Sequence, residues 1–335
     1  MATLQAPDAQ RLAAAARTKL AARARQVATA ARERASERLA TRPQPAVEER
    51  AAADDDPTVR FDPGHYYSPM YDPRELLAEP ARSRIWPPTP HERPGIDFRE
   101  QAQRSFMVDV LGAQERLVLR ADGDPEDGEY YALNGQFPPL DAWVLEGMLR
   151  DLRPQRMIEI GSGFSSLITA QVNRELLGGE LEFVCIEPYP RGFLSAGVDG
   201  IAELVVSKVE DVPLERFEAL GDGDVLFVDT SHVIRTGNDV AWIYGQILPR
   251  LKPGVRIHIH DVFLPGDYPE QWVREGWGWN ENYLVEAFLQ FNSAFEILFG
   301  AQWALHHARD EIAIACPQFA QAPERGGGSL WLRRT

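Results

Sequence analysis

Residues 156–166, RMIEIGSGFSS, constrain the fold of this chain more than any other segment. A short apolar run leads into Gly161-Ser162-Gly163, a pattern that predicts a buried parallel strand turning tightly into a helix. Glycines are needed there because a Cβ atom would keep the backbone away from a bound nucleotide, and because such a turn can require positive φ. The segment therefore predicts a nucleotide site at the end of the first strand of an α/β fold.

The acid before this turn indicates which nucleotide binds. Glu159 can accept a hydrogen bond from a ligand ammonium group, whereas it would repel a pyrophosphate. Ser166 stands where the dinucleotide pattern has its third glycine. Both features favour S-adenosylmethionine (SAM), and an NAD(P)-dependent oxidoreductase on the same kind of sheet stays as the alternative.

Strand and helix patterns alternate after Arg156, which predicts a parallel sheet covered by helices on both faces. Two further strands are expected near the C-terminal end of the sequence, as a hairpin-like pair. Helical periodicity also precedes the glycine turn. We expect strands at 157–160, 182–186, 202–206, 225–228, 255–259, 295–299 and 329–333, and helices at 97–110, 140–152, 165–175, 190–196, 213–220 and 238–251.

The ends of the second and third predicted strands complete a donor-binding set with the glycine turn. Glu187 ends the second strand, where a carboxylate can accept hydrogen bonds from a ribose diol. Val209 and Glu210 follow the third strand, where they can contact the adenine or belong to an ordinary surface loop. The expected donor-binding residues are Glu159, Gly161, Gly163, Ser165, Glu187, Val209, Glu210 and Asp229.

Polar residues also follow the fourth and fifth strands, in DVLFVDTSHV and VRIHIHDVFLP. We expect Asp229, His232 and His260 to be catalytic, with a histidine as general base near neutral pH. Asp229, His260 and Asp261 are the expected ligands of a divalent cation such as Mg²⁺. Structural hydrogen bonding without catalysis is the alternative. His258 alternates with His260 along the strand, and we assign it to the core.

The other segments of the sequence indicate structure and function less specifically. Residues 1–56 form an Ala/Arg-rich helical or disordered extension with a linker, 57–135 a cap region, mostly loop or extended where it is rich in proline, and 136–335 the main domain. Within that domain, residues 267–288 insert four aromatic side chains that can form a substrate lid or simply pack in a core.

Composition limits the function classes. The net charge of −15 argues against a nucleic-acid partner, since phosphate contacts need a basic surface. Two cysteines offer no disulfide framework, and no apolar run reaches the roughly 18 residues of a membrane helix. We expect a cytoplasmic protein that acts on a small molecule and does not bind membranes, and a homo-oligomer is left open.

Taken together, these segments resemble the class I SAM-dependent methyltransferases, and specifically a bacterial branch similar to small-molecule and sugar O-methyltransferases. The resemblance rests on YYALNGQF, IEIGSGFSS, FVDTSHV and HIHDVFLP. It implies a Rossmann-like, doubly wound sheet of seven strands with the last strand antiparallel. In related enzymes D-x-x-H follows strand four and two adjacent acids follow strand five, with the acids holding Mg²⁺ and the histidine deprotonating a hydroxyl. Here His260 replaces the first of those acids.

We therefore predict a SAM-dependent methyltransferase that methylates a hydroxyl of a small metabolite, such as a sugar or natural product. A SAM-binding scaffold without turnover, docked through the basic extension, is a further alternative.

Overall fold

The computed structural model describes residues 61–112, 117–316 and 326–335. The extension predicted over residues 1–56 lies outside the described residues. Asp62–Thr335 form one compact unit. None of the helices in the described part of the chain combines the length and the apolar character that crossing a membrane requires.

A seven-stranded sheet of order β3-β2-β1-β4-β5-β7-β6 forms the centre of this unit. Strands β1 to β5 are parallel, and β7 runs antiparallel to both of its neighbours, β5 and β6, as predicted. The predicted closing pair is confirmed, although helices separate its two strands in the sequence. The strands are β1 (Arg156–Ile160), β2 (Glu182–Ile186), β3 (Glu203–Val205), β4 (Val225–Val228), β5 (Arg256–Ile259), β6 (Phe295–Gly300) and β7 (Leu330–Arg334).

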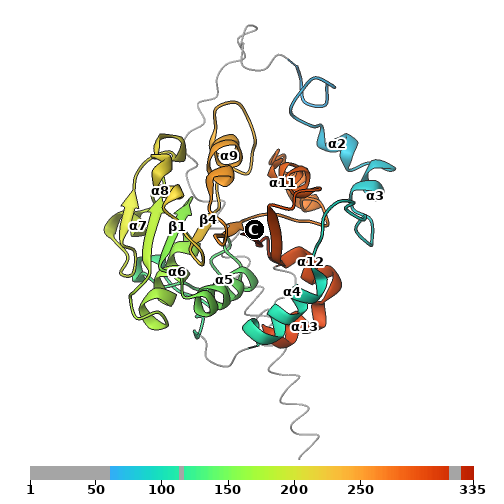
Figure 1. Cartoon of the computed structure of the whole chain (residues 1–335). Coiled ribbons are helices and arrows are strands. Elements are labelled where there is room, and N and C mark those ends of the chain that lie inside the picture. Colours follow the sequence, from blue (N-terminus) through green and yellow to red (C-terminus); the bar gives the residue numbers. More distant parts are fainter. Residues whose placement is uncertain (1–60, 113–116, 317–325) are drawn as a thin grey trace, which may run out of the picture. The chain divides into compact units, whose positions relative to one another are not determined.

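Helices cover both faces of the sheet because successive strand side chains alternate between two apolar cores. Met157 and Phe227 belong to the core under α5 and α6, whereas Ile158 and Val228 belong to the core under α8 and α11. Figure 1 shows α5 and α6 on one side of β1 and β4, with α9 and α11 on the other. The helices are α5 (Pro139–Leu152), α6 (Phe164–Glu175), α7 (Gly192–Ala196), α8 (Leu214–Glu218), α9 (Asp239–Trp242), α10 (Glu270–Arg274), α11 (Glu281–Leu289), α12 (Ala301–His307) and α13 (Arg309–Ala315).

Two predicted helices differ from those in the structure. The helix predicted over 238–251 is α9 followed by a π-helical turn, η4 (Ile243–Ile247), and a 3₁₀ turn, η5 (Leu248–Arg250). Pro249 explains the change, because proline lacks an N–H group and its ring clashes with the carbonyl four residues earlier. The helix predicted over 97–110 begins only at Glu100, because Arg99 adopts the left-handed conformation. It is α4 (Glu100–Phe106), followed by the π-helical turn η1 (Met107–Leu111).

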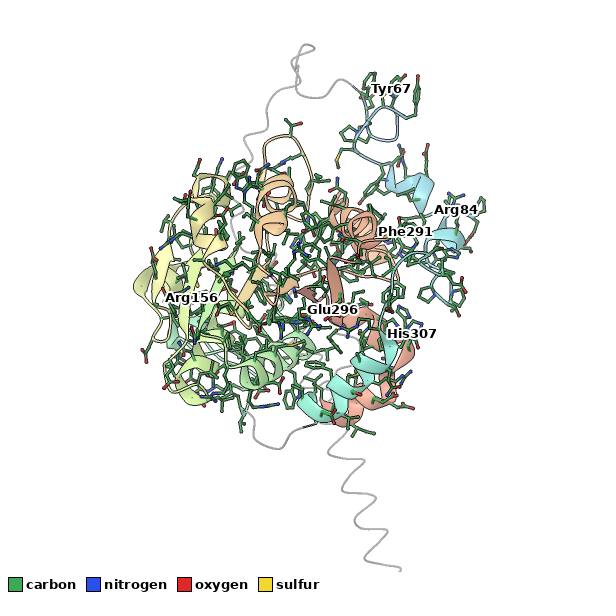
Figure 2. All side chains as sticks on the ribbon, viewed as in Figure 1. Tyr67, Arg84, Arg156, Phe291, Glu296 and His307 are labelled. Atoms are coloured by element: carbon green, nitrogen blue, oxygen red, sulfur yellow. The ribbon has the colours of Figure 1, made fainter. Side chains whose placement is uncertain are left out.

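The segment before α4 is largely irregular, as predicted, but it contains two short helices, α2 (Pro73–Leu76) and α3 (Ala81–Ile85). Tyr67 and Arg84 lie on this segment (Figure 2). It packs on the aromatic insertion: the Trp86 indole donates to the Tyr268 carbonyl at 2.8 Å, and Arg82 pairs with Glu270 at 2.9 Å.

The strand order reverses between β1 and β4. Successive crossovers lead outward from β1 to β3, and the chain then returns to place β4 on the other side of β1. Ligands of open α/β sheets bind at the carboxyl edge beside such a reversal. The fold therefore directs attention to the residues that follow β1 and β4.

Candidate active site

The glycine turn after β1 allows two strand ends to approach closely. Gly161 has φ of +80°, and a Cβ atom placed on it would lie 1.7 Å from the Asp229 carbonyl oxygen. Its own N–H donates to Ile186 O at 2.9 Å. No other residue type fits this position, because both the backbone angle and the space exclude a side chain.

A cavity of about 200 Å³ lies at this turn. Of the expected donor-binding residues, Gly161, Gly163, Ser165, Glu187 and Asp229 line it. The Glu187 carboxylate spans the cavity rim, accepting from Ser162 N at 3.1 Å and Tyr189 N at 2.8 Å. Five residues outside the expected set also line it: Gln136, Phe137, Ser162, Phe164 and Arg191. The first two belong to the NGQF segment that carries the family resemblance, whereas nothing in the sequence singled out Arg191.

Glu159 lies beneath the turn and does not line the cavity. It is fully buried, accepts from the Ser166 hydroxyl at 2.5 Å and contacts the Cys185 thiol at 3.5 Å. Burial raises the pKa of Glu159 to about 7, against the hydrogen bonds from Ser165 and Ser166. One carboxyl oxygen, Oε1, is buried without a hydrogen-bond partner. Its predicted contact with a ligand ammonium group stays a prediction.

The two expected adenine contacts also lie outside the cavity lining. Val209 begins the 3₁₀ turn η3 (Val209–Asp211) and is buried in the core, and Glu210 is half-buried beside it. Their role in adenine binding stays a prediction.

Three polar side chains meet where β4 and β5 end. His232 Nε2 lies 3.2 Å from Asp229 Oδ1 and 3.6 Å from Asp261 Oδ2. His232 and Asp261 both have positive φ, 56° and 53°, which is uncommon for residues other than glycine. Such conformations cluster at functional sites, where the surroundings enforce them.

A fourth side chain, Glu281, completes this group and was not predicted from the sequence. Its Oε2 lies 3.1 Å from His232 Nδ1, and the residue is 1% exposed. Glu281 begins α11 inside the aromatic insertion, 49 residues after His232. No spacing pattern in the sequence connects the two.

The charges of this group are coupled. Burial alone would lower the pKa of His232, but hydrogen bonds to Asp229 and Glu281 and the charge of Asp261 raise it well above its ordinary value. Burial would raise the pKa of Asp229, yet His260 and His232 lower it to about 2. The acids around His232 therefore favour the charged form of its imidazole over the neutral form.

The other two histidines occupy different surroundings. His258 lies in the core, with its ring stacked on Phe227 at 3.8 Å and its Nε2 3.0 Å from the Ser329 hydroxyl. His260 is buried against Phe137, with Nε2 3.7 Å from Asp261 Oδ1. Burial disfavours the charged form of His260, but Asp261, Asp229 and Asp141 raise its pKa.

The candidate cation ligands differ by one residue from the predicted set. Asp229, His232 and Asp261 each offer one ligand atom, and these atoms lie within 4.8 Å of one another. His232 is the histidine of this group, with Nε2 between the two acids, whereas the role predicted for His260 as a cation ligand stays a prediction. One nitrogen and two carboxylate ligands fit a divalent cation that accepts imidazole, such as Mn²⁺ or Zn²⁺, better than Mg²⁺, which prefers oxygen.

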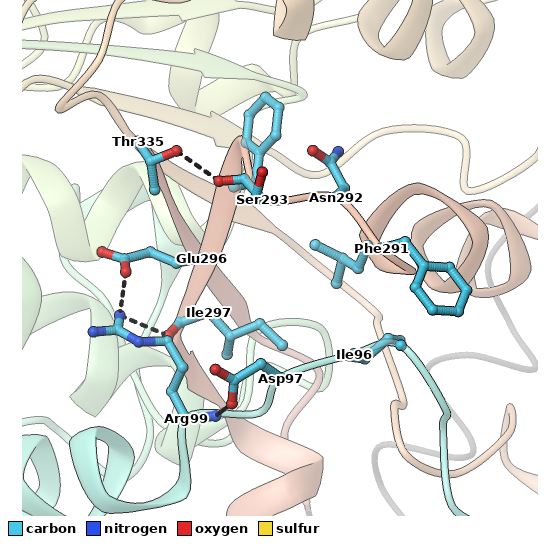
Figure 3. Close-up of a pocket in the computed structure, with 12 residues that line it drawn as sticks. Ile96, Asp97, Arg99, Phe291, Asn292, Ser293, Glu296, Ile297 and Thr335 are labelled. Carbon is cyan, nitrogen blue, oxygen red and sulfur yellow. Dashed lines mark hydrogen bonds and ion pairs between the residues drawn. The ribbon is translucent and has the colours of Figure 1, made fainter.

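A larger cavity of about 420 Å³ lies beside β6, and Figure 3 shows its lining. Arg99 crosses its wall to pair with Glu296 at 2.9 Å and donates to Ile297 O at 3.3 Å. None of the expected site residues lines this cavity. Cavity size alone would therefore have selected a place remote from the glycine turn.

Comparisons with known proteins agree with the position of the site. Residues 158–262 match the model of a family described as "Methyltransferase domain". An uncharacterized protein of Archaeoglobus fulgidus is 36% identical over 169 residues, which are 48% of this chain and 73% of that relative.

Solved structures are similar at a greater distance. The O-methyltransferase TomG of Streptomyces achromogenes, in complex with SAM, is 16% identical with a TM-score of 0.33, over 76% of this chain and 93% of that one. The SAH-bound methyltransferase PaMTH1 of Podospora anserina is 16% identical with a TM-score of 0.40, over 72% and 98% of the two chains. The chain belongs to the same family as the archaeal relative, and its residues 158–262 belong to a methyltransferase domain.

Proposed function

We propose that this enzyme methylates a hydroxyl group of a small, hydroxylated acceptor at the edge formed by Asp229, His232 and Asp261. The observation that carries the proposal is the position of Asp229. This residue lines the donor cavity and also lies 3.2 Å from His232 Nε2, so one side chain joins the donor site to a titratable group. A hydroxyl acceptor needs a methyl donor and a proton acceptor side by side, because its proton must leave as the methyl group arrives.

The residues around the cavity bind and orient the two reactants. When bound, SAM supplies an electrophilic methyl group on its sulfonium. The Gly161 turn and Glu187 hold the donor on one side of Asp229, and the acceptor hydroxyl enters on the other. Holding both in near-attack geometry can supply roughly 7–11 kcal/mol of the barrier reduction.

Proton removal falls to His232. Glu281 holds Nδ1, which leaves Nε2 as the nitrogen that faces the carboxylates and the acceptor. His232 accepts the hydroxyl proton at Nε2 when its imidazole is neutral, and its raised pKa makes that form more abundant as the pH increases. The same three side chains fit a divalent cation. A bound cation would occupy His232 Nε2, so His232 could not then accept the proton, and the cation would instead activate the hydroxyl by polarising its oxygen.

The proposal is tested with His232→Ala in the full-length enzyme. SAM turnover is measured against a panel of glycosides, phenols, amines and thiols, with and without Mg²⁺, Mn²⁺ or Zn²⁺, and SAH affinity is measured by calorimetry. We expect turnover with a hydroxyl acceptor, an approximately 10²–10⁴-fold loss in the variant and unchanged SAH affinity. His306→Ala, which alters an exposed histidine at the end of α12, is the matched control. Turnover with amines or thiols alone, or an unaffected His232→Ala enzyme, would refute hydroxyl methylation through His232.

A further inference from the structure

Three consecutive residues of the aromatic insertion contact His232 from three directions. The Trp279 ring packs on the imidazole with centroids 4.3 Å apart. The backbone N–H groups of Asn280 and Glu281 both donate to His232 O, at 3.0 and 3.1 Å. The Glu281 carboxylate reaches Nδ1 at 3.1 Å.

The same segment also holds the backbone beyond His232. The Asn280 side-chain oxygen accepts from Ile234 N at 2.7 Å. His232 lies between these contacts with φ of +56°, a conformation that a residue with a side chain seldom adopts unless its neighbours enforce it. The backbone angle, the ring face and one ring nitrogen are thus all set by residues 279–281.

We propose that Trp279, Asn280 and Glu281 form a clamp that aims His232 Nε2 at Asp229 and Asp261, with Glu281 as the main positioning residue. The inference rests on the proposed role of His232 in proton removal, and it adds a role for the insertion. The sequence left residues 267–288 open between a substrate lid and ordinary core packing, whereas the clamp gives the start of α11 a role in positioning His232.

The geometry explains why a carboxylate suits position 281. An imidazole ring can rotate about its side-chain bonds, and either nitrogen can carry the proton of the neutral form. A buried acceptor at Nδ1 fixes both the ring orientation and the tautomer, so that Nε2 faces the reacting groups. Trp279 restrains the imidazole further through its ring contact, in which the two ring planes are tilted by 43°.

The clamp is tested first without any acceptor. In full-length protein labelled with ¹⁵N-histidine, the Nδ1 proton bound to Glu281 should give a resolved low-field resonance. We expect this resonance to disappear in Glu281→Ala and in His232→Ala, and to persist in Tyr283→Phe. Tyr283 is the matched control, because it lies on α11 like Glu281 but its hydroxyl donates to Asp267, at 2.8 Å, and not to His232.

Turnover with the hydroxyl acceptor gives the second measurement. Glu281→Ala should lower kcat by about 10–100-fold while SAH affinity stays unchanged, and Glu281→Gln, which keeps an acceptor oxygen, should recover part of the loss. A low-field resonance that persists in Glu281→Ala would overturn the clamp. Normal turnover in Glu281→Ala, together with impaired turnover in His232→Ala, would also overturn the clamp. If His232→Ala itself turns over normally, the proposed function fails, and the resonance still decides whether the clamp exists.

Discussion

The burial of Glu159 predicts how the free energy of unfolding depends on pH. Its carboxyl group is fully buried, and its pKa rises from 4.5 to about 7. The folded state therefore binds this proton more tightly than the unfolded state does. The resulting stabilisation is complete below pH 4.5 and is lost as the pH rises through about 7. One pKa unit corresponds to about 1.4 kcal/mol, so the group should remove about 3 kcal/mol of folding free energy across this range.

Glu159→Gln separates this effect from the rest of the protein. Glutamine keeps the shape and can still accept from Ser166, but it carries no charge at any pH. Urea unfolding followed by tryptophan fluorescence between pH 5 and 8 should show the wild type losing about 3 kcal/mol relative to the variant. Glu182→Gln, an exposed carboxylate on neighbouring β2, is the control. Parallel stability curves for wild type and Glu159→Gln would refute the reasoning. If Glu159 also meets the donor ammonium group, saturating SAM should reduce the difference, since that contact favours the ionised acid.

Two further predictions concern the catalytic edge. The surroundings of His232 raise its pKa, so kcat should increase towards alkaline pH. Asp261→Asn removes one of the charges that raise this pKa and should move the increase in kcat to lower pH. A pH–rate profile that does not move would contradict the assignment of His232 as the base. Gly161→Ala should destabilise the protein by about 2–4 kcal/mol and abolish SAH binding, since its Cβ atom would meet the Asp229 carbonyl, whereas Gly192→Ala in α7 should do neither. Denaturation and calorimetry measure both effects, and equal behaviour of the two variants would count against the turn geometry.

The sheet was predictable because its signals are local. Each strand of the parallel core is a short apolar run, and each is followed by turn residues, so the strand order and the carboxyl-edge residues follow from general rules. The glycine turn, Glu187 and Asp229 were found this way, and they meet at one cavity. Asp229, His232 and Asp261 converge for the same reason, since each follows one of two adjacent strands.

The sequence was least informative where side-chain direction depends on backbone conformation. His260 was preferred to His232 as a cation ligand because it directly precedes Asp261 in the sequence. The left-handed conformations of His232 and Asp261 reverse that preference, and no sequence pattern signals them, because both residues usually have negative φ. Glu281 was missed because it comes from a separate insertion.

The two left-handed residues are held by different parts of the chain, and this difference bears on how the site works. Asp261 is fixed from the side of the main domain: a Cβ atom on Gly328 would lie 2.8 Å from Asp261 Cα, and buried Asp141 of α5 accepts from Gly328 N at 2.9 Å. His232 is instead fixed by the insertion through residues 279–281. A change at residues 279–281 should therefore affect the imidazole directly, whereas other residues line the donor cavity. Under the proposed function such a change lowers turnover and leaves SAH affinity unchanged, which is why a split between these two quantities is the decisive measurement for this site.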